Sequence, residues 1–123
     1  MKTLAVIVTT PPQANLTTTA IGFIKQSYKA NIKIVGVFFY QDGVYNAANN
    51  CQFASDEYQT TQQWQVLHQQ LNIPLHLCAT AAEKRGLLAQ QGDENSLINR
   101  EFIISGLGEL VELTNQADKV VQL

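Results

Sequence analysis

Short runs of aliphatic and β-branched residues alternate along this chain with segments whose apolar residues recur at helical spacing. The clearest runs are 4–8 and 32–40, and shorter ones occupy 74–78, 102–104 and 119–121. An apolar run closed by turn residues is typical of a strand buried on both faces of a parallel sheet. Strands that alternate with helices are joined by right-handed crossovers. The pattern therefore predicts an α/β fold, a mainly parallel sheet of about five strands with helices on both faces.

The first two helices are expected between 9 and 31 and between 55 and 71. Apolar residues recur at helical spacing in the first, which ends near Asn31; they are Leu16, Ala20, Phe23, Ile24 and Tyr28. Ser55 or Asp56 is expected to cap the second helix, where side-chain oxygens accept from free backbone N–H groups. Its predicted inward residues are Tyr58, Trp64, Leu67 and Leu71. The intervening residues 44–54 are polar and aperiodic, which predicts a surface loop with at most one helical turn.

Two more helices are expected in the second half of the chain. Thr80 and Glu83 have the spacing of a capping box, which opens a helix that ends at Gly86. Ser105 is expected to cap the last helix, whose predicted inward residues are Leu107, Leu110, Val111 and Leu113. Residues 88–100 are polar and contain a glycine, which predicts an irregular or partly helical connection.

Composition limits the kind of protein this is. With 46% hydrophobic and 15% charged residues, 123 residues are enough for one domain, 1–123, that needs no disulfide or metal for stability. The formal net charge is -2, and scattered lysines and arginines form no basic stripe, so direct nucleic-acid binding is not expected. No apolar run approaches a membrane span, and the first run lacks a cleavage site. We expect a soluble, cytoplasmic protein.

The chain has two cysteines, Cys51 and Cys78, which are too few for a disulfide framework and lack the spacing of a zinc site. Cys78 ends a predicted strand just before a predicted helix start, where partial positive charge favours a thiolate. Free cysteine is also among the most buried residue types. Spacing alone therefore favours a small apolar filler at Cys78 and leaves a reactive thiol open.

The remaining candidate residues carry weaker signals. Cys51 lies in the polar loop, where an incidental surface cysteine is favoured over a resolving thiol. His76 projects to the same sheet face as Cys78 and is a candidate base, as is His68, although ordinary polar roles are favoured for both. Residues 105–108 resemble a phosphate loop, but Val111 occupies the position of the third glycine, so a tight turn is favoured.

Five segments resemble one known family in order and spacing: 38–47, 54–57, 78–86, 105–110 and 118–123. Together they cover nearly the whole chain and are similar to TusD and its close relative DsrE, a family of sulfur-relay proteins. The family's reactive cysteine falls on Cys78, which the resemblance makes the catalytic residue, whereas Cys51 has no counterpart.

The resemblance implies a sulfurtransferase subunit that works beside TusB-like and TusC-like chains. Such a subunit takes persulfide sulfur from a TusA-like donor and passes it to a TusE-like acceptor, for 2-thiouridine formation in tRNA, without a cofactor. DsrE-like relatives serve sulfur oxidation in a DsrEFH complex, and this pathway stays open for the chain. A scaffold subunit without transfer activity and a nucleotide-binding or flavodoxin-like module are also compatible with the predicted fold.

Thiol exchange sets one physical requirement. The Cys78 thiolate must attack a donor persulfide and later be attacked itself, so it must be reachable from a cleft or an interface. The aromatic and amide-rich residues 38–50 leave the neighbouring strand at the same end and are expected to line that cleft or a subunit contact.

Overall fold

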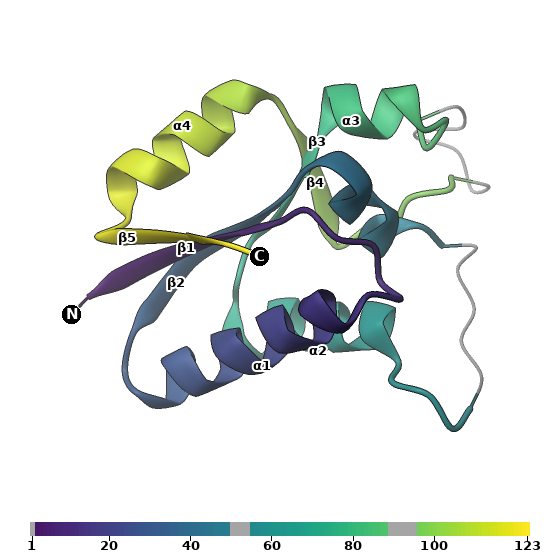
Figure 1. Cartoon of the computed structure of the whole chain (residues 1–123). Coiled ribbons are helices and arrows are strands. Elements are labelled where there is room, and N and C mark those ends of the chain that lie inside the picture. The colour runs from purple at the N-terminus through teal and green to yellow at the C-terminus, as the bar shows by residue number, and fades with distance from the viewer. Residues whose placement is uncertain (1, 50–54, 89–95) are drawn as a thin grey trace.

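A computed structural model describes residues 2–49, 55–88 and 96–123. Its five strands form one sheet in which every pair is parallel, in the order β4-β3-β2-β1-β5 (Figure 1). The strands are β1 Thr3–Val8, β2 Lys33–Phe39, β3 Leu75–Cys78, β4 Phe102–Ser105 and β5 Lys119–Gln122. The predicted α/β class and the five parallel strands are confirmed.

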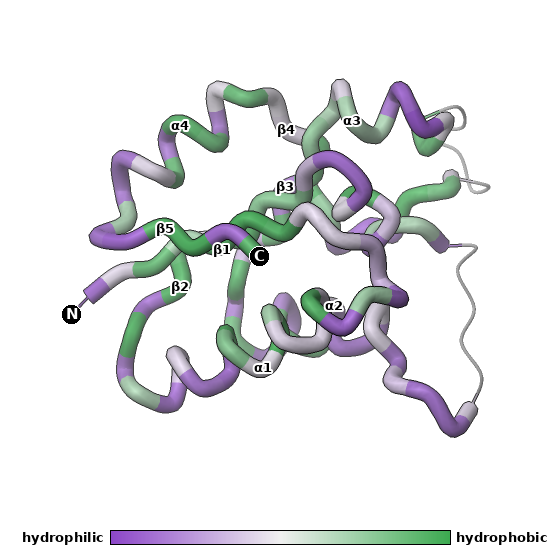
Figure 2. The backbone as a smooth tube through the Cα atoms, in the orientation of Figure 1, coloured by the Kyte–Doolittle hydropathy of each residue, from purple (hydrophilic) through white to green (hydrophobic). Residues whose placement is uncertain are grey.

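Helices cover both faces of this sheet, as predicted. They are α1 Asn15–Lys29, α2 Thr60–Leu71, α3 Ala79–Lys84 and α4 Leu107–Gln116, with a 3-10 helix, η1, at Gln41–Ala47. α1 and α2 lie together on one side of the sheet, and α4 lies on the other (Figure 1). The most hydrophobic stretches of the backbone follow the central strands (Figure 2). η1 follows β2 and α3 follows β3, so both short helices lie at the carboxyl ends of these strands.

The core is centred on β1, β2 and β3. Phe39 on β2 packs its ring edge against Trp64 of α2 at 4.8 Å and against Phe102 of β4 at 5.1 Å, measured between ring centroids. Trp64 and Leu67 are buried, as predicted. Edge-to-face aromatic pairs add to the free energy gained from burying the rings.

The segment predicted as a surface loop, 44–54, is described only over 44–49, and most of these residues are buried. Residues 41–47 form η1, in which Val44, Asn46 and Ala47 have no exposed surface. The Asn46 side chain donates to the carbonyls of Thr10 and Gly43 and accepts from the Trp64 indole N–H at 3.0 Å. A polar residue is stable inside the protein when all its hydrogen bonds are made, and the polar composition of this stretch hid that possibility.

Helix starts are the least accurate part of the prediction. α2 begins at Thr60 after Gln59, so neither Ser55 nor Asp56 caps it, and Tyr58 precedes the helix and is exposed. In α1, Ala20 and Ile24 are buried, but three of the predicted apolar residues are exposed: Leu16, Phe23 and Tyr28. Helical spacing identifies an apolar stripe, yet it does not say how much of the stripe the sheet covers.

The last helix differs in the same way. Gly106, not Ser105, is the N-cap of α4, and Ser105 is the final residue of β4. Leu113 is buried as predicted, whereas Leu107 and Val111 are 50% and 57% exposed. Among the described residues, no helix is both long and apolar enough to cross a membrane.

Candidate functional site

Cys78 is the last residue of β3 and the N-cap of α3, at the end of the sheet where parallel α/β proteins bind ligands. Its side chain makes no capping hydrogen bond, and only 1% of the residue is exposed. The predicted capping box is wrong, because Thr80 lies inside the first turn of α3. The position of Cys78 is therefore set by the end of β3 and not by a capping side chain that follows it in the sequence.

The thiol lines a pocket of about 230 Å³. The residues around it are Tyr40, Gln41, Cys78, Thr80, Ala81, Lys84, Arg85 and Leu107. Cys78 ends β3, Tyr40 directly follows β2, and the others belong to η1, to α3 and its C-cap Arg85, and to the first turn of α4. Although Cys78 has almost no exposed surface, it is therefore at the wall of a cavity and not inside the sheet.

Two cations stand at this pocket, and sequence reasoning missed both. Lys84 and Arg85 follow Cys78 by nearly two helical turns. This spacing was the only feature of the sequence that could have placed them near the thiol. Arg85 forms an ion pair with Asp42 at 3.0 Å and also donates to the Ala81 carbonyl. Lys84 has no ion pair within the described residues. Lys84 and Arg85 are the positively charged residues among those that line this pocket, and α3 itself is only six residues long.

The opposite wall is a tightly held turn. Gln41 has φ 52°, in the left-handed region, and its neighbour Tyr40 donates its backbone N–H to the Val8 carbonyl at 2.9 Å. Gly43 donates back to the Tyr40 carbonyl, which closes the turn. The expectation that residues 38–50 line the cleft is thus met at Tyr40 and Gln41, whereas Tyr45 is not among the pocket residues.

The two histidines lie apart from the pocket. His76 Nδ1 is 3.0 Å from the Ser105 hydroxyl, and burial lowers the pKa of His76 below its ordinary value while Glu109 raises it to a smaller extent. His68 bonds through Nδ1 to the Ile73 carbonyl at 3.1 Å. Cys51, the weaker thiol candidate, lies outside the described residues.

The loop 105–108 borders a shallow groove of about 700 Å³ between β4 and α4. The carboxylates of Glu109 and Glu112 line this groove and would repel a phosphate group. The geometry therefore disfavours nucleotide binding at this loop. No group of three or more potential metal ligands occurs in the described part of the chain.

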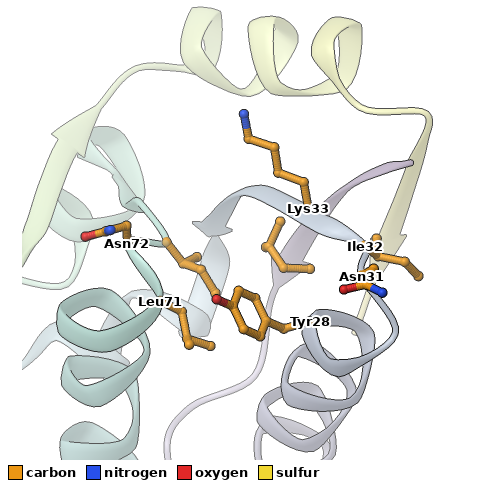
Figure 3. A pocket seen from close by; sticks show the side chains of 8 residues that line it. Tyr28, Asn31, Ile32, Lys33, Leu71 and Asn72 are labelled. Atoms are coloured by element: carbon orange, nitrogen blue, oxygen red, sulfur yellow. The ribbon is translucent and has the colours of Figure 1, made fainter. Parts of the chain in front are cut away.

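A further cavity, of about 340 Å³, lies at the opposite end of the sheet. There Tyr28 of α1 and Leu71 of α2 approach each other, while the Lys33 side chain points away from them toward α4 (Figure 3). The eight residues that line it include no cysteine, histidine or carboxylate. This cavity has no group suited to thiol exchange.

Fold and site together define a class: a parallel α/β protein with a free thiol at the carboxyl end of a central strand. The family model described as the DsrE/DsrF-like family matches residues 2–123. The chain belongs to the DsrE/DsrF-like family, as its sequence segments predicted.

Individual relatives agree with this membership. The chain is 36% identical over 108 residues to a protein named Sulfurtransferase TusD from Cronobacter sakazakii, which covers 84% of each chain. It is 34% identical over 124 residues to Sulfurtransferase TusD from Salmonella arizonae, covering 96% of this chain and 97% of that protein. The crystal structure of the ychN protein from E. coli superposes with a TM-score of 0.73, at 25% identity, over 100% of this chain and 99% of that one.

Proposed function

We propose that this protein is a sulfurtransferase that carries sulfur as a persulfide on Cys78. The observation that supports this most directly is the thiol at the wall of a small pocket that Lys84 and Arg85 border. Two relatives at 34% and 36% identity bear the name Sulfurtransferase TusD. A nearly buried thiol that is reachable only through a pocket fits selective exchange with a docked partner better than general reactivity with solutes.

The reaction is a thiol exchange. The Cys78 thiolate attacks the terminal sulfur of a donor persulfide, the S–S bond of the donor breaks, and the donor leaves as a thiolate. The acceptor's thiolate later attacks the outer sulfur of the Cys78 persulfide in the same manner. Each step exchanges one S–S bond for another, so no cofactor is required, and the neighbouring cations stabilise the anionic sulfur in both steps.

For the partners we propose a TusA-like donor, a TusE-like acceptor, and TusB-like and TusC-like chains that assemble with this one. The destination we propose is 2-thiouridine in tRNA, which the TusD relatives favour over the sulfur-oxidation pathway of DsrE-like proteins. The protein itself does not contact nucleic acid in this scheme. Because free thiols persist in reducing compartments, we place the relay in the cytoplasm.

The test is sulfur loading of the purified protein by a persulfide-bearing TusA-like donor, followed by mass spectrometry. We expect one added sulfur atom on the Cys78 peptide, which a reductant removes. Cys78→Ser is expected to keep the fold and accept no sulfur, and Cys51→Ser is the matched control that still accepts it. Loading that survives Cys78→Ser, or a wild type that takes no sulfur with its partner chains present, contradicts the proposal and favours a scaffold subunit.

A further inference from the structure

Three side chains share one face of the sheet at its carboxyl end. His76 and Cys78 are two residues apart on β3, and alternate residues of a strand point to the same face. Ser105 pairs in register with Cys78 on the neighbouring strand β4. Adjacent strands lie roughly 4.8 Å apart. Ser105 is therefore next to Cys78 across the strands and next to His76 diagonally.

The Ser105 hydroxyl is already bonded to the imidazole. Its Oγ lies 3.0 Å from His76 Nδ1 and 3.3 Å from the Ile103 carbonyl oxygen. With the imidazole hydrogen on Nδ1, His76 donates to Ser105 Oγ and the hydroxyl donates to the Ile103 carbonyl. In the tautomer with hydrogen on Nε2, the hydroxyl donates to His76 Nδ1 instead, and the Oγ lone pairs stay available to another donor. Cys78 is the residue that pairs with Ser105 in the strand register, which makes its thiol the candidate donor.

We infer that Ser105 and His76 form a proton relay that removes the proton of Cys78 when its thiol becomes the attacking thiolate. The inference rests on the proposed function, since it assigns a proton path to that thiol. Ser105 and His76 are positioning residues here, because they act through Cys78.

The protons balance over one transfer. The S–H bond of Cys78 breaks and its proton passes to Ser105 Oγ, while the hydroxyl proton of Ser105 moves to His76 Nδ1. The thiolate then attacks the donor's terminal sulfur, and the donor leaves as a thiolate that takes the proton back from the imidazolium. No group is oxidised or reduced overall, and the imidazole ends neutral.

The pocket needs a base from outside its own walls. None of the eight residues that line it is a histidine or a carboxylate, so none of them is suited to accept the thiol proton. His76 is 8% exposed, which favours its neutral, proton-accepting form. Besides His76 itself, the titratable residues that line its groove are Glu109 and Glu112 of α4. Their negative charge stabilises the imidazolium that the relay forms.

The remaining neighbours of the imidazole carry no charge. Its partners in the sheet are Phe38 on β2 and Ile103 on β4. Within the described residues no hydrogen bond joins Ser105 to Cys78, so the relay needs the thiol to turn toward Ser105 Oγ while Oγ keeps its bond to His76. The Cys78 side chain makes no capping hydrogen bond, and it turns by rotation about a single side-chain bond, between staggered rotamers.

The experiment measures alkylation of Cys78 by iodoacetamide as a function of pH, by peptide mass spectrometry, in a Cys51→Ser background. We expect His76→Gln and Ser105→Ala to slow alkylation at neutral pH by about tenfold or more, as loss of a general base does. The rise of the rate should also move to higher pH. Ser105→Thr keeps the hydroxyl and is expected to react like the parent. His68→Gln is expected to do the same, because His68 bonds to the Ile73 carbonyl and lines neither the Cys78 pocket nor the groove beside His76.

A purely structural role for the pair predicts a different result. In that case His76→Gln and Ser105→Ala lower the melting temperature but leave the pH profile of alkylation where it is. Unchanged profiles in both variants, with circular dichroism showing a native fold, overturn the relay. Sulfur loading of the same proteins separates the two proposals, because a parent that takes no sulfur overturns the transfer function while the alkylation profiles still decide the relay.

Discussion

Arg85 Nη2 and the Asp42 carboxylate lie 3.0 Å apart, and this ion pair joins the end of α3 to η1 beside the Cys78 pocket. Arg85 Nε donates to the same carboxylate oxygen at 3.0 Å. The pair is partly exposed, since the Asp42 side chain is 60% accessible, so it contributes little to global stability. Its consequence is local: it holds one cation at the pocket wall while Lys84 stays available to an incoming anion.

The first prediction concerns the charge of the pocket. Lys84→Gln removes a positive charge from the Cys78 pocket. An anionic reagent is attracted by that charge and should react more slowly without it, whereas a neutral reagent should be unaffected. We expect the ratio of iodoacetate to iodoacetamide alkylation rates at Cys78 to fall roughly two-fold, as for one screened charge in water. The matched control is Lys29→Gln at the end of α1, which is expected to leave the ratio unchanged. A ratio that falls equally in both variants would point to net charge instead.

The second prediction concerns close packing at Gly43. A Cβ atom there would lie 2.1 Å from the Val8 carbonyl oxygen, a backbone atom that cannot move aside without shifting β1. Gly43→Ala is therefore expected to lower the free energy of unfolding in urea by about 3 kcal/mol or more. Gly22 is the control, because it is exposed within α1 and a Cβ there meets nothing within 4 Å. Gly22→Ala should raise stability by about 0.5–1 kcal/mol.

The third prediction concerns Asn46. Its replacement by alanine leaves the Trp64 indole N–H and the carbonyls of Thr10 and Gly43 without the bonds they now make. We expect the unfolding free energy to fall by about 2–4 kcal/mol, because buried polar groups left unpaired retain their desolvation penalty. Asn49→Ala is the control, since the Asn49 side chain donates to the Ser96 carbonyl at an exposed site. Similar losses in both variants would contradict a special role for the buried network.

The fourth prediction is a pH dependence of stability. Burial lowers the pKa of His76 in the folded protein below its ordinary 6.5, so the unfolded chain binds more protons just below that pH. The unfolding free energy should therefore fall as the pH falls below about 6.5, and the loss should end once the folded-state pKa is passed. His76→Gln is expected to flatten this slope, as measured by urea denaturation at several pH values. Glu109→Gln should steepen it, because its carboxylate raises the pKa of His76.

Local patterns in the sequence were sufficient for the strands and for the position of Cys78 at a strand end, whereas the family resemblance made Cys78 the candidate site residue. The five strands, the parallel sheet and the position of Cys78 at a strand end follow from short apolar runs closed by turn residues. Those patterns depend on burial of a strand on both faces, which leaves a trace in consecutive residues. Family membership was likewise visible in five segments and is confirmed by the match over residues 2–123.

The tertiary structure decided what those elements bring together. Ser105 meets His76 across 29 residues only because β4 lies beside β3, and the pocket combines Gln41 with Lys84 only because η1 lies against α3. Strand order is set by how whole helices pack on the sheet, a long-range balance that leaves no local period. For the same reason the exposed Val111 and the buried Asn46 were both misassigned. The sequence by itself determined the strands and the thiol, and the fold determined the charges and hydrogen bonds that surround them.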